Sequence, residues 1–315
     1  MQELTDMPET APTYPKKTRE VHNMLMDSTR WDSFQFRDGD IVIDTWAKSG
    51  TTWTQQIVSQ LIFEGAENLA ALDISPWLDM RVIPLDEMIA NLDAQTHRRF
   101  LKTHLPADAL EISPKAKYIF LARAGKDVVW SWYNHLANMT PEFYDQINNT
   151  PGRVGPPLNR PTGDVRKFFH DWLEDGGLYD WPYWSHIQSW WDIRDVPNVR
   201  LLHYNDLKAD MPGEIRRIAE FLEIDIDEER WPDIVEHCTF DYMKKHADTL
   251  SEVFKDAFEG GLKTFIYKGT NGRWRDVLTP EDLEKYDNVE NANLTPDCAR
   301  WHATGEMPDS QLEAD

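Results

Sequence analysis

Short apolar runs rich in β-branched residues alternate along the chain with longer segments in which apolar residues recur at helical spacing. The first run, residues 40–46 (DIVIDTW), follows a turn at Asp38-Gly39 and predicts a buried strand. Similar runs lie at 100–104, 117–123 and 198–204, and helix-like segments lie at 126–138 and 207–222. This alternation predicts an α/β fold in three layers, with a central parallel sheet flanked by helices.

Two stretches follow neither period. Residues 148–163, NNTPGRVGPPLNRPTG, are dense in Pro, Gly and Asn and predict a long loop, which is either a lid or a surface excursion. Residues 256–270 are irregular and rich in Gly and Lys. We find no internal repeat, so we interpret residues 1–315 as one domain, with 1–15 and 305–315 as peripheral tails.

Composition indicates a folded protein of a reducing compartment. The 41% hydrophobic content with 14 Trp excludes a disordered chain. No apolar run approaches the ~20 residues that span a bilayer, and the N-terminus has no apolar core of a signal peptide. Two cysteines, Cys238 and Cys298, are too few for a disulfide framework. We therefore expect a cytoplasmic protein without a membrane partner.

The net charge of −22 disfavours a nucleic-acid partner, which requires a basic surface. A small anionic ligand stays compatible with this charge, because a few cations in a cleft override the global field locally. We interpret most of the acidic residues as a solvated surface.

The segment after the first strand predicts an anion site. Residues 47–52, AKSGTT, form a small-residue turn, and apolar residues from Trp53 onward recur at helical spacing as far as Gly65, which we interpret as a C-cap. Unpaired N–H groups and the helix dipole converge at such a helix start and bind phosphate. The order differs from a Walker A loop, because Lys48 precedes Gly50 and Thr51 stands in the place of the Walker lysine.

In this arrangement Lys48 lies at the mouth of the loop, where a mobile ammonium can follow charge developing on a leaving phosphate. Trp53 offers a flat face on which a purine can stack. The string TWAKSGTTW resembles the 5′-phosphosulfate loop of the cytosolic sulfotransferase family. The resemblance implies that the donor 3′-phosphoadenosine 5′-phosphosulfate (PAPS) is bound by the loop residues Lys48, Ser49, Gly50, Thr51, Thr52 and Trp53.

Two further strands end in residues that are suited to catalysis or phosphate binding. Ligands bind beyond the carboxyl ends of parallel strands, so these residues are candidates for the site. The run FLKTHLP places Lys102 and His104 at one end, and a His near neutral pKa can take a proton from an attacking hydroxyl. KTHLP resembles the family pattern in which the His is the base. Lys102 would then neutralise charge on the transferring group.

The next strand ends in Arg123, followed by a helix that contains Ser131. A planar, permanently charged Arg with a hydroxyl nearby suits a terminal phosphate. FLARAGKDVVWSWYNH resembles the family element in which this Arg and Ser hold the 3′-phosphate of the donor. The usual Arg-[Asn/Asp]-Pro reads Arg-Ala-Gly here, which loosens the turn without removing a ligand.

Weaker matches extend the resemblance. Tyr204 and Phe240 correspond to residues beside the purine, and Cys238 stands where a Thr commonly bonds the base. In TFIYKGTNGRW, Lys268 and Gly269 match the second phosphate segment, whereas Tyr267 replaces an Arg. We expect this loss to cost donor affinity unless Arg273 or Arg275 turns inward.

The resemblance covers about residues 16–286 and implies inline transfer of a sulfuryl group, without a metal or a covalent enzyme intermediate. Lys48 would stabilise the leaving phosphate, His104 would deprotonate the acceptor, and Ser131 would restrain Lys48 until the acceptor arrives. The product would be 3′-phosphoadenosine 5′-phosphate (PAP).

The expected acceptor is a small molecule with an aromatic or apolar body and a hydroxyl group, because aromatic residues dominate the segments expected to line its pocket. The pocket candidates are Trp77, Met80, Trp132 and His135, together with Tyr133 and with Phe143 and Tyr144, which we place on the long loop. Most other tryptophans are interpreted as core, including Trp181, Trp184, Trp190 and Trp191.

Two alternative functions stay open. A P-loop kinase would require Mg²⁺ and the Walker order, and a non-catalytic nucleotide-binding protein would keep the phosphate loop but lose the base. Residues 275–284 only loosely echo a short dimer motif of some relatives, so both a monomer and a homodimer are compatible with the sequence.

Overall fold

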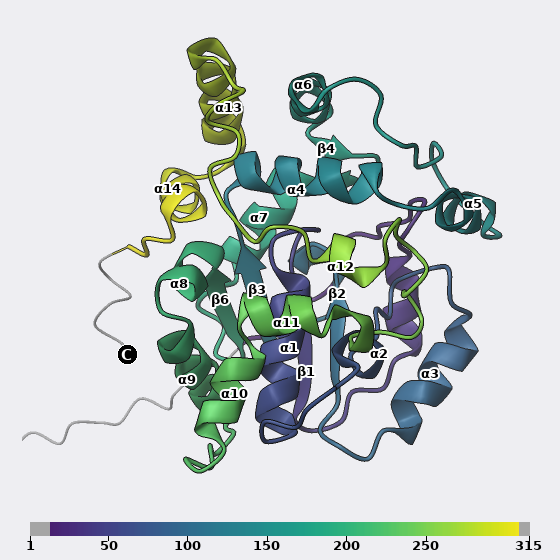
Figure 1. Ribbon diagram of the computed structural model, residues 1–315, viewed down its shortest axis with the longest axis vertical. Helices are drawn as coiled ribbons and strands as arrows, with labels where there is room; N and C mark the ends of the chain where they lie inside the picture. The colour runs from purple at the N-terminus through teal and green to yellow at the C-terminus, as the bar shows by residue number, and fades with distance from the viewer. Residues whose placement is uncertain (1–12, 309–315) are drawn as a thin grey trace, which may run out of the picture.

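The computed structural model describes residues 13–308. Its central sheet has four parallel strands in the order β2-β1-β3-β6. Their bounds are β1 Asp40–Asp44, β2 Phe100–Thr103, β3 Ala116–Ala122 and β6 Val199–His203. Three of them lie within the runs predicted as strands, and β3 begins one residue before its run. The predicted class, a P-loop-like parallel sheet flanked by helices, is confirmed (Figure 1).

The remaining elements connect or cover these strands. They are η1 Ser28–Ser33, α1 Thr51–Ile62, α2 Ala71–Ile74, α3 Leu85–Ala94, η2 Ala107–Ala109, α4 Gly125–Ala137, α5 Pro141–Asn149, α6 Val165–Asp175, β4 Gly177–Leu178, β5 Trp181–Pro182, α7 Tyr183–Trp191, α8 Tyr204–Ala209, α9 Met211–Leu222, α10 Trp231–His237, α11 Phe240–Lys245, η3 Ala247–Thr249, α12 Leu262–Phe265, α13 Pro280–Asn293 and α14 Pro296–Thr304. β4 and β5 form a separate antiparallel pair.

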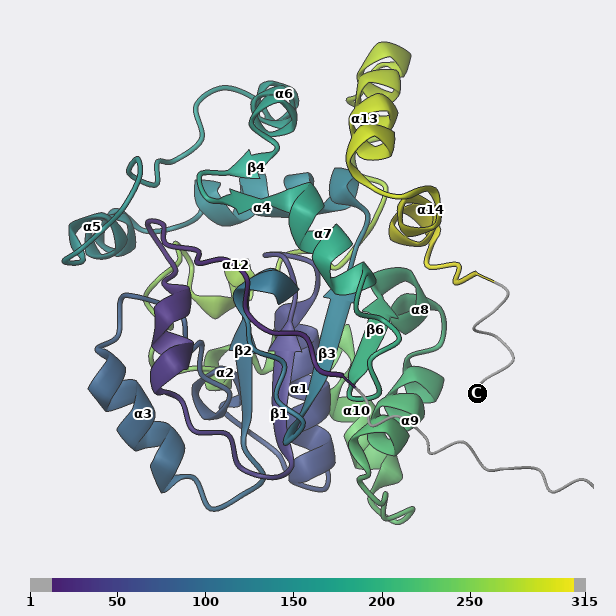
Figure 2. The same ribbon diagram turned by 180° about the vertical axis from the view of Figure 1, so that it is seen from behind.

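The side chains of the sheet alternate between two cores, as the pleat of a strand requires. Ile41 and Ile43 of β1 pack with α1, α9 and α10, whereas Val42 packs on the opposite face with residues of α4, α7 and α14. Figure 1 shows α1 and α10 in front of the sheet, and Figure 2 shows α7 and the N-terminal segment on its other side. Burial on both faces explains why these strands read as continuous apolar runs.

Several boundaries differ from the prediction. β1 ends at Asp44, and α1 already begins at Thr51, the phosphate-loop threonine. The predicted helix 207–222 is two helices, because the chain turns at Asp210, whose side chain accepts a hydrogen bond from Gly213 N–H and caps α9. Residues 262–265 of the predicted irregular stretch form α12.

The predicted long loop begins within α5, and residues 150–163 contain no helix or strand. Phe143 and Tyr144, expected on that loop, lie on α5. The C-terminal helices α13 and α14, which the sequence reading did not predict, pack against α7. Most of the tail residues 1–15 and 305–315 lie outside the described residues. In the part of the chain that the structure describes, no helix has the length and apolarity to cross a membrane.

Candidate functional site

The loop between β1 and α1 forms the floor of the site. Lys48 has a φ of 68° and Gly50 one of 124°, both in the region that favours glycine. A Cβ at Gly50 would lie 2.7 Å from a methyl group of Leu121, so only glycine fits there. The hydroxyls of Thr45 and Thr51 are 2.6 Å apart. No side chain caps the start of α1, which leaves its first N–H groups available to an anion.

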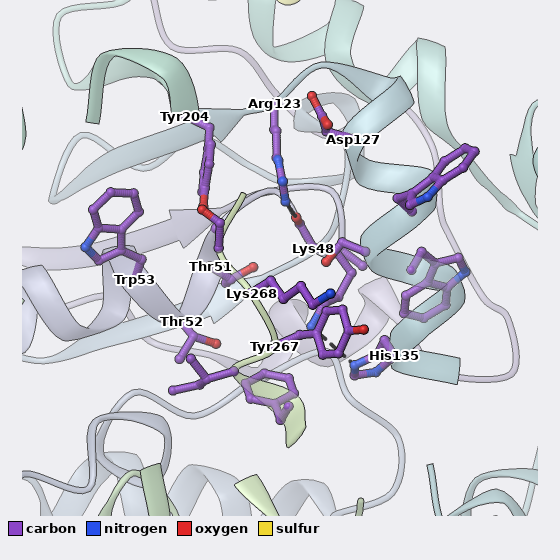
Figure 3. Close-up of a pocket in the computed structure, with 18 of the residues that line it drawn as sticks. Lys48, Thr51, Thr52, Trp53, Arg123, Asp127, His135, Tyr204, Tyr267 and Lys268 are labelled. Atoms are coloured by element: carbon purple, nitrogen blue, oxygen red, sulfur yellow. Dashed lines mark hydrogen bonds between the residues drawn. The ribbon is translucent and has the colours of Figure 1, made fainter. Parts of the chain in front are cut away.

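A cavity of about 400 Å³ opens above this loop and brings together most of the predicted site residues (Figure 3). The predicted residues that line it are Lys48, Gly50, Thr51, Thr52, Trp53, Trp77, Met80, Lys102, His104, Arg123, Ser131, Trp132, His135, Tyr204, Phe240, Lys268 and Gly269. They come from segments far apart in the sequence, which meet at the carboxyl ends of the parallel strands.

Two predicted donor-binding residues, Ser49 and Cys238, do not line the cavity. The Ser49 hydroxyl is buried, and no residue in the range 13–308 forms a hydrogen bond with it. The Cys238 thiol packs into the core beside α1, although the carbonyl of this residue accepts a hydrogen bond of 2.8 Å from Trp53 Nε1–H. The structure therefore gives Cys238 a role in orienting Trp53 through its backbone.

Lys48 lies deep in the cavity, with its ammonium 3.3 Å from His135 Nδ1 and 4.2 Å from the ring centroid of Phe265. Figure 3 shows Lys48 and His135 joined in this way. Burial, with the nearby charges of Lys102 and Arg123, lowers the pKa of Lys48 to about 7. The ammonium of Lys48 contacts His135, one helical turn beyond Ser131 on α4. The restraint of Lys48 by Ser131 stays a prediction.

His104 is held in one orientation by the backbone of the phosphate loop. Its Nδ1 lies 2.6 Å from the Thr45 carbonyl oxygen, which can only accept, so Nδ1 carries the proton and Nε2 keeps a lone pair. The ring lies 4.7 Å from that of Trp77 and 5.6 Å from that of Trp181. Burial first and then Lys102 hold the pKa of His104 well below its usual value, so the imidazole is neutral.

Lys102 lies against the same aromatic wall, with its ammonium 4.7 Å from the ring of Trp77. Burial lowers the pKa of Lys102 to about 8, and the charge of Asp79 opposes this shift. Lys48 and Lys102 are thus both ammonium groups that lose their proton more readily than usual, and an incoming anion would stabilise their charged form.

Arg123 is buried and binds the loop that closes the far end of the cavity. Its guanidinium donates to Asn271 Oδ1 at 2.7 and 3.0 Å and to the Thr270 and Lys48 carbonyls at 3.1 and 3.2 Å. Asp127 accepts from Gly272 N–H at 2.6 Å and anchors the same loop. The sequence reading missed Asn271 and Asp127, because an Asn before Gly reads as an ordinary turn residue.

The opposite side of this end is aromatic. Gly269 has a φ of 59°, and a Cβ there would lie 2.7 Å from the Phe240 ring. Its carbonyl accepts a hydrogen bond of 3.4 Å from the hydroxyl of Tyr204, whose ring lies 5.5 Å from that of Trp53. The guanidinium of Arg123 lies 4.3 Å from the Tyr204 ring centroid. Trp53, Tyr204 and Phe240 thus give this end of the cavity aromatic walls, on which a planar base can stack.

Arg273 lies beside Tyr267, the residue that stands where the family pattern has an Arg. Arg273 lines the cavity with its guanidinium 4.8 Å from the Tyr267 ring, whereas Arg275 lies over Trp274 at 5.2 Å and does not line it. Of the two arginines considered as substitutes, the structure turns Arg273 inward.

The end of the cavity beside His104 is apolar. Trp181, predicted as core, is buried but also lines the cavity, while Trp184, Trp190 and Trp191 are core residues as predicted. The apolar lining residues that were not predicted include Leu25, Met139, Ile147, Leu158, Phe265 and Ile266. Phe143 lines this end from α5, and Leu158 does so from the long loop.

Comparisons with known proteins agree with this geometry. The sulfotransferase domain family matches residues 38–296. A glycolipid sulfotransferase of Mycobacterium bovis is 34% identical over 93% of this chain and 96% of its own length. Human sulfotransferase 1E1 is 33% identical over 87% of this chain and 92% of its own length.

Solved structures share the fold. Retinol dehydratase in complex with androsterone and the inactive cofactor PAP has a TM-score of 0.67 at 24% identity, covering 85% of this chain and 84% of its own. Mouse sulfotransferase SULT7A1 complexed with PAP has a TM-score of 0.66 at 22% identity, covering 86% and 90% of the two chains.

Proposed function

The chain belongs to the sulfotransferase family and is a PAPS-dependent sulfotransferase, and from this premise we propose that His104 is the general base of an inline sulfuryl transfer to a hydroxyl group. The observation that carries the proposal is the hydrogen bond between His104 Nδ1 and the Thr45 carbonyl. It leaves Nε2 as a proton acceptor in a cavity that also contains Lys48.

In the proposed step the acceptor oxygen forms a bond to sulfur as the bond between sulfur and the bridging phosphate oxygen breaks. The hydroxyl proton passes to His104 Nε2, and the electron pair of the broken bond leaves with PAP. Lys48 stabilises the charge on the bridging oxygen, and Lys102 neutralises charge on the sulfuryl group. Because its pKa is lowered, His104 is neutral before the step and Nε2 is free of a proton.

The donor would lie across the phosphate loop and the Arg123 end. Backbone N–H groups at the start of α1 would bind the 5′-phosphate, and Arg123 with Ser131 and Lys268 would bind the 3′-phosphate. The adenine would lie between Trp53 and Phe240. The binding roles of these residues are part of the proposal, as is independence from metal ions.

The acceptor would be a molecule with a large apolar body and one reactive hydroxyl. Trp77, Met80 and Phe143 support this class, because they give the cavity beside His104 an apolar lining. The names of the relatives agree, since one is a glycolipid sulfotransferase and one structural neighbour holds androsterone. A cytoplasmic location, a monomeric or homodimeric state and a lid formed by 148–163 stay predictions.

Calorimetric titration of PAP into the purified protein in EDTA tests the donor site. We expect tight binding of PAP and weak binding of ATP, with or without Mg²⁺, because the loop lacks the Walker order. Mg²⁺-dependent ATP binding with no PAP binding would contradict the proposal and favour the kinase alternative. PAP binding without transfer to any member of a panel of phenols and long-chain alcohols would favour the non-catalytic one.

A further inference from the structure

A buried polar network links the C-terminal helices to the turn that carries Arg123. The Tyr183 hydroxyl donates to the Arg123 carbonyl at 2.8 Å, and it lies 2.6 Å from His302 Nε2. The other ring nitrogen of His302, Nδ1, lies 2.6 Å from Glu290 Oε1. Tyr183 and His302 are fully buried and Glu290 is 6% exposed, so solvent contributes little to this network.

A second arm reaches the same turn from the other side. The hydroxyl of Tyr286 donates to Glu290 Oε1 at 3.4 Å, and the same hydroxyl packs against Gly125. A Cβ at Gly125 would lie 2.6 Å from the Tyr286 hydroxyl oxygen, so the network fits tightly against a glycine. The two arms meet at Glu290 and hold the turn 123–125 at both ends.

Counting protons gives a direction to the bonds of Tyr183. Tyr183 has one proton and donates it to the Arg123 carbonyl, so His302 Nε2 must donate to Tyr183. Glu290 Oε1 accepts from the Tyr286 hydroxyl and shares a hydrogen bond with His302 Nδ1. Each hydroxyl on the path from Tyr286 round to the Arg123 carbonyl therefore has an acceptor. A fully satisfied buried network of this kind is rigid.

We propose that α13 and α14 are a structural part of the donor site, because Tyr183, Tyr286, Glu290 and His302 fix the turn that positions Arg123 for the 3′-phosphate. This inference rests on the phosphate-binding role proposed above for Arg123. Figure 1 shows both helices outside the central sheet, and they pack against α7, which carries Tyr183. None of these four residues lines the cavity, so they act on Arg123 through its backbone as positioning residues.

The inference also explains a departure from the family pattern. The family pattern that this segment resembles has Arg-[Asn/Asp]-Pro, and this chain has Arg123-Ala124-Gly125. A proline at position 125 would carry a Cβ, which would lie 2.6 Å from the Tyr286 hydroxyl oxygen. Gly125 and Tyr286 are thus complementary, and the network restores the rigidity that the turn loses with the proline.

The test uses Tyr183→Phe and Tyr286→Phe, each of which removes one hydroxyl from the network. We expect either variant to weaken PAP binding about fivefold, the effect of one buried hydrogen bond, and to raise KM for PAPS equally with kcat unchanged. Tyr118→Phe is the matched control. It removes a buried hydroxyl that donates to the Glu111 carbonyl and accepts from Ser113 N–H, away from the site. Tyr118→Phe should lower Tm about as much as Tyr183→Phe and Tyr286→Phe do, without changing donor affinity.

A double-mutant cycle tests the coupling directly. Gly125→Ala should weaken PAP binding about tenfold or more in the wild-type background, because its Cβ meets the Tyr286 hydroxyl. In the Tyr286→Phe background the same substitution should cost only about threefold or less, because that oxygen is gone. Either of two results would overturn this inference alone. One is that the losses of PAP affinity from Gly125→Ala and Tyr286→Phe are additive. The other is that both Phe variants bind PAP with wild-type affinity while Arg123→Ala binds it weakly. Failure of the wild-type protein to bind PAP would overturn the proposed function with it.

Discussion

The buried ammonium of Lys48 predicts that donor binding is linked to proton uptake. With the pKa of Lys48 lowered to about 7, this lysine is about one-tenth neutral at pH 6 and about nine-tenths neutral at pH 8 in the free enzyme. A phosphate beside Lys48 stabilises the ammonium and restores its charge. Binding of PAP should therefore take up about 0.1 proton at this site at pH 6 and about 0.9 proton at pH 8.

The affinity that Lys48 provides for PAP should fall as the pH rises. Since the pKa of Lys48 is lowered, its charge is present below pH 7 and is lost as the pH rises through that value. Protonating Lys48 at pH 8 costs about 1.4 kcal/mol, which corresponds to a tenfold loss of the affinity that its charge provides. His135 contributes no compensating charge, because burial and the neighbouring Lys48 keep its pKa well below the usual value.

The assay is calorimetry of PAP in phosphate-free buffers that differ in ionisation enthalpy, at pH 6 and pH 8. Lys48→Met is the reference, because Lys102 and the phosphates of PAP titrate in both proteins and cancel in the difference. We expect the affinity advantage of the wild-type protein over this variant to shrink about tenfold between pH 6 and pH 8. Lys48→Arg, which stays charged, should show no such change.

Equal proton uptake by the wild-type protein and Lys48→Met at pH 8 would refute this reasoning. It would show that Lys48 stays charged in the free cavity, and that neither burial nor the charges of Lys102 and Arg123 weaken its basicity.

Three further substitutions test other parts of the structure. Arg99→Ala leaves the carboxylate of Asp40 buried without its partner at 2.5 Å, so unfolding in urea should show a loss of about 3–5 kcal/mol. Gly269→Ala forces a Cβ into the Phe240 ring at a φ of 59°, so titration should show PAP binding weakened about tenfold or more, and the strain should also lower Tm. Arg273→Ala should weaken PAP binding about fivefold, whereas Arg275→Ala, its control, should not; equal effects would contradict the inward assignment of the first.

Local chemistry explains why much of the site could be predicted from the sequence. Lys48, Gly50 and Thr51 belong to one contiguous turn whose backbone requirements are visible in nine residues. Lys102, His104 and Arg123 end strands that read clearly because both faces of the sheet are buried. The parallel topology then brings these strand ends together without further information.

The parts that the sequence did not predict depend on contacts between distant segments. Asn271 binds the Arg123 guanidinium across 148 positions, and no local pattern distinguishes it from a turn residue. The pairing of Lys48 with His135 rather than Ser131 depends on the direction in which one helical turn faces. Trp181 has the burial of a core residue and also lines the cavity, so its size and hydrophobicity could not separate the two roles.

The central claim is that His104 removes the acceptor proton. The most direct measurement compares wild-type protein and His104→Ala in the transfer of labelled sulfate from PAPS to a phenol or a long-chain alcohol, with PAP affinity measured in parallel. We predict that the variant loses transfer by about 10²–10⁴-fold and binds PAP within about twofold of wild type. Transfer that survives the substitution, or PAP binding lost to the same extent as transfer, would contradict the assignment of His104 as the base.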